Sequence, residues 1–480
     1  MKKLIAIIIL LAGVIFFACK HGSTPTINNS FCASKTTDGT CPILPIDISE
    51  VFPNVGYESD LDSIHQPPID VFSWQTFIAL NWPADASGKP TGSSIADLPN
   101  APRVWEFYQD PAEVFGHPVA PLVFQLGIAK RSGQKFLYLD SKSPRALNNG
   151  VKVDMNKLDG FQEADGHPLI DRNLNFTLYE IKMNPIEAKY VVDKKLTTLE
   201  GIYNYGLKNG NAISLPQSDS ATNNVGSMEI KASWRILLPS AGDDTTRYYC
   251  RKATIFIDSA HTRNKKNLII TNVTVGLVGM HIIRKTTKLN IDEIWSTFEH
   301  IDNTPDDPQQ AQQGSTVWSY YNPLCLNCLP NKAPDTLKGD GGQYIWETTM
   351  PYAIKYAKKA PSQTSGQLYG TQAVRTYPIY KYTNMLNRLW QDKLKAQGSV
   401  WANYRLVGSQ WEKNDIPNGP KAPSLLGNTT LETFIQNNSS CISCHSGANV
   451  VFNSDTISTN MSFLFGTYAQ GGLLSKKAKK

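Results

Sequence analysis

Charged residues are scarce in this chain of 480 residues, because Asp, Glu, Lys and Arg together make up 18% of it, whereas about a quarter is usual. The formal net charge of +6 is small for this length. Four of the positive charges lie in the last five residues, which we interpret as a solvated end that could also contact an anionic membrane surface or an acidic partner. Nothing in this pattern indicates nucleic-acid binding.

Long apolar runs are lacking after the first seventeen residues, so we expect no second segment that crosses a membrane. Residues 1–19 combine a basic start, an apolar run from Leu4 to Phe17, and Ala18 before Cys19, an order that resembles a bacterial lipobox. The sequence therefore predicts a lipoprotein signal peptide with a lipid anchor on Cys19. The mature protein would lie in the cell envelope and face the periplasm or the cell exterior. An uncleaved anchor is the alternative, although the run is short for a full span of about 20 residues.

Cysteine and histidine are also infrequent, with eight of each, yet three of them form one motif. Cys441 and Cys444 are separated by two residues and followed at once by His445. Two thiols at this spacing can reach the two vinyl groups of one porphyrin, and the next imidazole can bind the iron. The motif predicts one covalent haem c with His445 as metal ligand. A chance motif or a disulfide is the alternative.

The remaining cysteines fit an oxidising compartment. We expect Cys32 to pair with Cys41 across a polar loop. Cys325 and Cys328 lack a following histidine, so we interpret them as a local disulfide; a redox-active dithiol or half of a zinc site is the alternative. Cys250 lies in a strand-like run and is expected to be a small buried hydrophobic residue.

The second axial ligand of the iron is left open by the sequence. Met461 lies sixteen residues after His445, and its thioether would raise the reduction potential. Packing in the core is the other reading of Met461. Further candidates are Met385, His281, His300 and a vacant position. His281 shares parity with Val273, Val275 and Leu277, so we expect its imidazole to face the same way as that apolar set.

Hydrophobic periodicity indicates an α+β chain with a large, mainly antiparallel β domain followed by a small, mostly helical cytochrome c-like domain. We predict a flexible tether over residues 20–68, the β-rich domain over 69–335, and the haem-binding domain over 336–480. Period-two patterns predict strands, and period-3.6 patterns predict helices near 70–82, 382–397 and 428–436. The predicted strands are 122–126, 135–139, 175–181, 229–236, 247–257 and 272–284.

Taken together, several motifs resemble those of uncharacterised bacterial single-haem "cytochrome c family" proteins, which are lipoproteins or periplasmic proteins. The resemblance spans most of residues 70–466 and rests on the segments 72–83, 229–235, 276–281, 295–303, 428–433 and 441–445. It implies that Cys441, Cys444 and His445 hold the haem, and His300 matches a histidine of the family. The family carries no settled activity.

Two functions remain open at this stage. The first is an electron carrier that passes single electrons between redox partner proteins. The second is a haem-dependent periplasmic oxidoreductase whose β domain binds a small substrate, with His281 or His300 moving protons. A sensor or interaction module is a third reading. The large β domain favours a substrate or partner site, whereas a single haem argues against the usual two-haem peroxidase plan.

Overall fold

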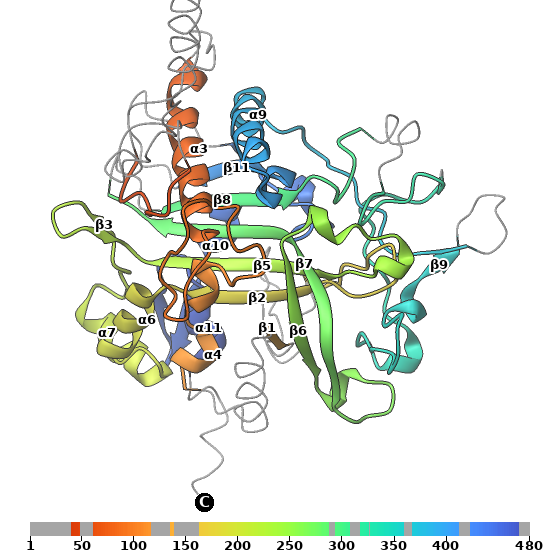
Figure 1. Cartoon of the computed structure of the whole chain (residues 1–480). Helices are drawn as coiled ribbons and strands as arrows, with labels where there is room; N and C mark the ends of the chain where they lie inside the picture. The colour runs from red at the N-terminus through yellow and green to blue at the C-terminus, as the bar shows by residue number, and fades with distance from the viewer. Residues whose placement is uncertain are drawn as a thin grey trace, which may run out of the picture.

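A computed structural model describes residues 40–48, 61–116, 135–138, 163–287, 293–307, 317–325, 327–359, 367–411 and 423–469. Within these ranges, seven strands form one sheet and six short strands form three hairpins (Figure 1). The sheet strands are β1 (Lys135–Tyr138), β2 (Leu178–Met183), β5 (Met228–Ile236), β6 (Cys250–Ile257), β7 (Leu268–Lys285), β8 (Glu293–His300) and β11 (Tyr404–Trp411). The hairpins are β3 (Ser218–Asp219) with β4 (Asn224–Val225), β9 (Lys358–Lys359) with β10 (Leu368–Tyr369), and β12 (Asn449–Phe452) with β13 (Asp455–Ser458).

The strands β11, β8, β7, β5 and β2 are consecutive antiparallel neighbours. The first half of the long strand β7 pairs with β6, and β6 pairs in parallel with β1. The α-helices around this sheet are α3 (Leu61–Leu80), α4 (Pro111–Val114), α6 (Pro185–Asp193), α7 (Leu199–Lys208), α9 (Lys381–Ala396), α10 (Cys441–His445) and α11 (Leu464–Tyr468). The expected α+β class with a mainly antiparallel sheet is confirmed. Among the helices in the described ranges, none is both long and apolar enough to span a membrane.

One face of the sheet is covered by α3 and α9, which pack against β8 and β11 (Figure 1). On α9, Leu386, Trp390 and Leu394 recur every fourth residue and are all buried, as an amphipathic helix requires. Trp74 of α3 stacks on Trp390 with ring centroids 5.8 Å apart, and Phe77 of α3 stacks on a phenylalanine of β8 at 4.2 Å. This face holds the largest apolar core of the described residues.

The opposite face of the sheet carries the segment 423–469, which contains the CxxCH motif. Beside it, a second apolar core joins α4, α6 and α7 to the β12–β13 hairpin and α11. Val191, Ile202, Ile457 and Phe465 are fully buried there. The CxxCH motif therefore sits on the sheet itself, with the smaller core next to it.

The predicted domain boundary at residue 335 does not coincide with a break in the sheet. β11 pairs with β8 over residues 404–411, and Leu386, Trp390, Trp401 and Leu406 belong to the same core as residues 71–298. The stretch 336–469 thus contributes a strand and a helix to the β-rich part. The hydrophobic pattern of this stretch predicts where its helices lie. It does not predict that β11 pairs with β8, a strand about a hundred residues earlier in the chain.

The predicted tether is also packed against the body where it is described. Ile48 joins a small core with Ile69 and Phe72, and Asp47 accepts a hydrogen bond from Thr287 at 2.9 Å. The helix α3 begins at Leu61, ahead of the helix predicted near residues 70–82 and of the β-rich domain predicted from residue 69. The signal peptide, the lipidation residue Cys19, the strand predicted at 122–126 and the tail after 469 lie outside the described residues.

The strands predicted at 135–139, 175–181, 229–236, 247–257 and 272–284 are confirmed, with small differences at their ends. The helices predicted near 70–82 and 382–397 are confirmed as α3 and α9. The helix predicted over 428–436 is wrong, because that segment is a series of turns. Asn428 and Glu432 do make a bond like that of a helix N-cap, since the Asn428 backbone N–H donates to Glu432 Oε2 at 3.0 Å. The chain does not go on as a helix, and the Asn428 side chain bonds the sheet instead.

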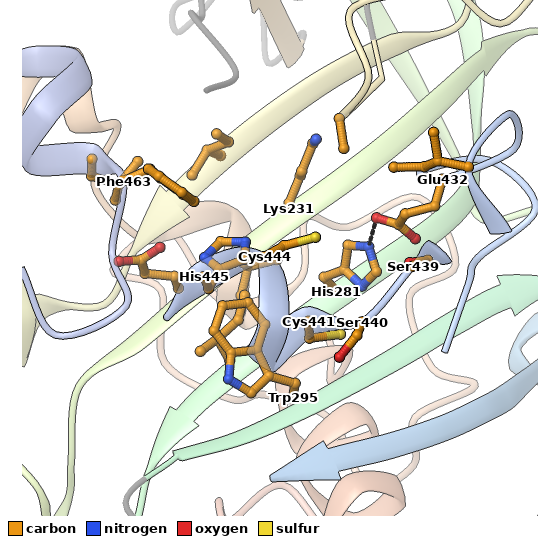
Figure 2. A pocket seen from close by; sticks show the side chains of 17 residues that line it. Lys231, His281, Trp295, Glu432, Ser439, Ser440, Cys441, Cys444, His445 and Phe463 are labelled. Atoms are coloured by element: carbon orange, nitrogen blue, oxygen red, sulfur yellow. Dashed lines mark hydrogen bonds and ion pairs between the residues drawn. The ribbon is translucent and has the colours of Figure 1, made fainter. Parts of the chain in front are cut away.

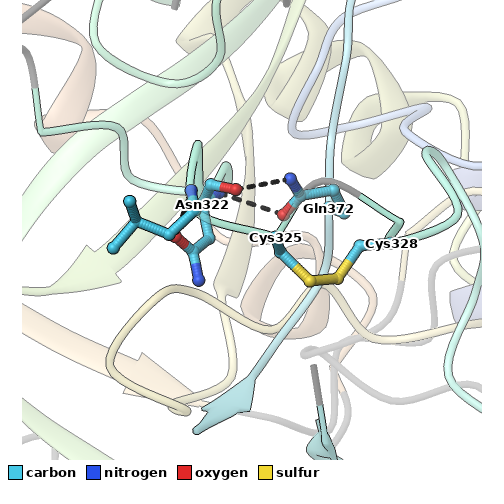
Figure 3. The surroundings of a disulfide bond; sticks show 5 residues. Asn322, Cys325, Cys328 and Gln372 are labelled. Atoms are coloured by element: carbon cyan, nitrogen blue, oxygen red, sulfur yellow. Dashed lines mark hydrogen bonds between the residues drawn. A yellow bond between two sulfur atoms is a disulfide. The ribbon is translucent and has the colours of Figure 1, made fainter. Parts of the chain in front are cut away.

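Cys325 and Cys328 form the predicted local disulfide, with their Cα atoms 5.4 Å apart. Figure 3 shows Gln372 bridging the backbone of Asn322 just before this disulfide: the Asn322 N–H donates to Gln372 Oε1 at 3.0 Å, and Gln372 Nε2 donates to the Asn322 carbonyl at 2.9 Å. The turn is thereby attached to the chain near residue 372. The predicted Cys32–Cys41 pair involves Cys32, which lies outside the described residues.

Candidate functional site

The position of His281 is set by a β-bulge in β7. Ser233 of β5 pairs with Gly279, but the next residue, Trp234, pairs with Leu277, so Val278 is an extra residue. A bulge of this kind inverts the alternation of the strand. Leu277 faces the main core, whereas His281 lines a cavity on the opposite face. The prediction that His281 shares the face of Val273, Val275 and Leu277 is therefore wrong.

The turn 428–433 lies directly on β7 at Gly279. A Cβ atom at Gly279 would fall on Thr430 Oγ1 and 2.6 Å from Ser233 Oγ. The Thr430 and Ser233 hydroxyls bond each other at 2.8 Å, and Asn428 Nδ2 donates to Thr297 Oγ1 of β8 at 2.8 Å. A segment of the protein itself thus makes a close approach to the backbone at this glycine.

Because the turn is held in this way, Glu432 reaches His281. Glu432 Oε1 lies 2.8 Å from His281 Nε2, and both side chains are nearly buried, at 14% and 12% exposed. Burial alone would raise the pKa of Glu432, but the charge and hydrogen bond of His281 and the Asn428 N–H lower it below its usual value. The carboxylate therefore accepts a hydrogen bond from the imidazole.

The CxxCH motif forms the short helix α10. Its N-cap is Ser440, whose side chain accepts from the Ser443 backbone N–H, and the Cys441 N–H donates to Gln410 Oε1 of β11 at 2.7 Å. Cys441 and Cys444 are three residues apart in one helical turn, and both thiols are free. Burial raises the pKa of both thiols, so they are neutral. The helix is thus anchored to the sheet with its two thiols unoxidised.

His445 is held in one tautomer. Its Nδ1 lies 2.8 Å from the Met461 carbonyl oxygen, which can only accept, so Nδ1 carries the proton. Burial lowers the pKa of His445 to about 4, so the ring is neutral and Nε2 keeps its lone pair. Trp295 and Phe463 pack against the ring, with centroids 4.2 and 5.0 Å from that of His445. Histidines that bind a metal usually donate their other ring N–H to a carbonyl or a carboxylate, and His445 has this arrangement.

These groups line one cavity, part of whose empty space of about 850 Å³ is open to solvent (Figure 2). Its walls come from β2, β5, β7 and β8 and from residues 432–445 and 463–464. The apolar lining residues are Ala164, Ile181, Ile230, Ile283, Trp295, Ile435, Phe463 and Leu464; the charged ones are Glu229, Lys231 and Glu432.

The residues present fit a covalently bound haem. Two free thiols and one imidazole with an available lone pair converge on a cavity that is mostly apolar. No group of three or more histidine, cysteine or carboxylate side chains that could hold a bare metal ion occurs in the described ranges.

The other predicted ligands occupy different places. His300 is fully buried away from the cavity: its Nε2 donates to the Arg247 carbonyl at 2.9 Å, and its Nδ1 accepts from the Asp302 N–H at 3.1 Å. Burial lowers the pKa of His300 to about 4, as expected for a neutral core histidine. Met385 lies on α9, and neither it nor Met461 lines the cavity. Met461 contributes its backbone carbonyl to His445 and stays a prediction as an iron ligand.

Sequence reasoning missed Glu432, Lys231, Glu229 and Trp295 as parts of the site. In the strand register, Lys231 of β5 lies opposite His281 of β7, and Glu229 of β5 lies opposite Ile283 of β7. Ile283 in turn lies opposite Trp295 of β8. The alternation of 229–236 shows that Glu229 and Lys231 share one face, but it indicates a solvated face. Only the docking of residues 423–469 covers that face.

The chain matches no protein-family model, no curated protein and no solved structure.

Proposed function

We propose that this protein is a cell-envelope c-type cytochrome that carries one covalent haem and transfers electrons between redox partner proteins. The observation that carries the proposal is the convergence of Cys441, Cys444 and His445 on a single, mostly apolar cavity, with both thiols free and His445 Nε2 available. The motif spacing and this geometry support the same cofactor independently.

A bound haem would supply one-electron chemistry, and the protein would position and tune it. Cys441 and Cys444 would each form a thioether with a vinyl group. His445 would bind the iron, because the Met461 carbonyl fixes the ring orientation and increases its basicity. Trp295 and Phe463 restrict rotation of the ring and exclude water from it.

The location belongs to the same proposal. Haem attachment to a CxxCH motif takes place on exported chains, and residues 1–19 have the order of a lipoprotein signal peptide. We therefore place the protein in the cell envelope, anchored by lipid on Cys19 and facing the periplasm or the cell exterior. Its partners would be redox proteins at this surface.

A second candidate is a haem-dependent oxidoreductase that acts on a small substrate. The His281–Glu432 pair favours it, because an imidazole and a carboxylate 2.8 Å apart in the same cavity can move protons. That function requires an iron position that stays open to a substrate.

Production of the full chain in a host that attaches haem to exported CxxCH proteins tests the proposal. We expect one haem that survives denaturing electrophoresis and adds the mass of one haem to the mature chain. The double variant C441S/C444S should lose the covalent haem. The matched control C250S removes another free thiol, which is bonded to the Thr245 carbonyl outside the cavity, and should keep it. A wild-type chain with a Cys441–Cys444 disulfide and no haem would overturn the proposal.

A further inference from the structure

The two ring nitrogens of His281 differ in their contacts, because Nε2 bonds Glu432 and Nδ1 does not. A carboxylate accepts hydrogen bonds, so the 2.8 Å contact with Glu432 Oε1 places a proton on Nε2 of His281. In the neutral ring Nδ1 then holds a lone pair. This is the same division of roles that the Met461 carbonyl imposes on His445 with the two nitrogens exchanged.

In many metal sites, the histidine that binds the metal donates its other ring N–H to a carboxylate in this way. The carboxylate orients the ring and makes the free nitrogen a better donor. Glu432 is itself fixed, because its Oε2 accepts from the Asn428 N–H at 3.0 Å and Asn428 bonds the Phe298 carbonyl of β8 at 2.8 Å. The support of His281 is therefore as rigid as the sheet.

His281 and His445 come from different parts of the fold and line the same cavity. His281 lies on β7, and His445 ends α10. Figure 2 shows both rings among the side chains of the cavity, with the dashed bond joining His281 to Glu432. The bulge at Val278 is what brings His281 to this face. Without it the imidazole would enter the main core.

We infer that His281 is the second axial ligand of the haem iron, coordinating through Nδ1 while Glu432 holds Nε2. The inference rests on the proposed attachment of haem at Cys441 and Cys444. Met461, Met385 and His300 do not line the cavity. A doubly histidine-ligated iron favours the electron carrier over the oxidoreductase.

Visible absorption and electron paramagnetic resonance of the haem-loaded full chain test this inference. The wild type should be low-spin in both oxidation states, should ignore carbon monoxide, and should lack the far-red methionine–iron band. H281A should become high-spin and bind carbon monoxide rapidly, and added imidazole should restore the low-spin spectrum. H281M should gain the far-red band, because a thioether then replaces the imidazole.

Two further variants complete the experiment. E432Q should stay low-spin with a raised reduction potential, since a weaker acceptor makes His281 a poorer donor. H261Q changes a histidine that contacts Tyr344 outside the cavity and should match the wild type. A high-spin wild type, or an H281A that stays low-spin through Lys231 or Met461, would overturn the inference. Loss of covalent haem from every variant would instead overturn the proposed function.

Discussion

Gly279 gives the sharpest test of how the cofactor site depends on the sheet. In Gly279→Ala, the new methyl group would meet Thr430 Oγ1 and lie 2.6 Å from Ser233 Oγ. Both oxygens belong to the bond that fastens the turn 428–433 to β5. Neither can move away without loss of that bond, so the contact between the turn and the sheet is disturbed.

The magnitude follows from two contributions. Overpacking by one methyl group costs roughly 1–3 kcal/mol, and loss of the Ser233–Thr430 hydrogen bond adds about 1 kcal/mol. We therefore expect the free energy of unfolding to fall by about 2–4 kcal/mol. Because the turn also positions Glu432 against His281, the haem spectrum should change towards high-spin.

Chemical denaturation and visible absorption measure the two effects separately. Gly276→Ala is the matched control, because its methyl group would be 2.7 Å from Leu237 Cδ1 and 3.0 Å from Tyr248 Cβ, outside the cavity. It should lose stability but keep the wild-type spectrum. Gly339→Ala meets nothing within 4 Å and should change neither quantity. A Gly279→Ala protein with unchanged stability and spectrum would refute the reasoning.

Three other predictions concern stability. Burial and the neighbouring Glu229 charge raise the pKa of Glu187 well above its usual value, so the folded state binds more protons than the unfolded state above about pH 4.3 and loses stability as the pH rises. The melting temperature of Glu187→Gln relative to the wild type should therefore increase between pH 5 and 8, while exposed Glu200→Gln shows no trend; a difference that is flat or falls with pH contradicts this. Arg235→Met removes the ion-pair partner of the buried Asp171 carboxylate and leaves Asp243 with Arg172 alone, so it should lower the free energy of unfolding by about 3–5 kcal/mol, against little change for Lys189→Met in an exposed ion pair; equal effects in denaturant titrations would rule the argument out. The Cys325–Cys328 disulfide closes a loop with a sequence separation of only 3, so its removal by double serine substitution should cost about 2 kcal/mol, and a much larger loss would show that the bond does more than restrict the unfolded chain.

The secondary structure was predictable where one residue pattern governs it. On β5 the alternation from Glu229 to Ile236 places Ile230, Ala232 and Trp234 in the main core, and the structure agrees. β7 shows the limit of the same rule. Its alternation is regular from Val273 to Leu277, and then one extra residue at Val278 reverses the two faces. A bulge depends on pairing with β5, which a local pattern does not contain.

The residues of the candidate site also differ in how far the sequence alone identifies them. Cys441, Cys444 and His445 were identifiable because the predicted attachment is local in sequence. The opposite wall was identifiable only in part: His281 was a candidate ligand, but Lys231, His281 and Trp295 come together only through the pairing of β5, β7 and β8. The turn 428–436 was misread as a helix because Asn428 and Glu432 form the capping bond of a helix start, although Thr429 bonds Glu299 of β8 and Thr430 bonds Ser233 of β5.

The order in which the chain leaves the ribosome gives this arrangement a consequence for maturation. The strands that form the cavity wall end at His300, whereas α10 begins at Cys441, so the wall is synthesised well before the segment that closes it. A fragment that contains only residues 423–469 would keep the attachment motif but would have neither His281 nor the Gln410 bond that anchors α10. Such a fragment should accept haem and leave one side of it exposed to water. Under the proposed function, the smallest autonomous haem-binding unit is therefore nearly the whole chain.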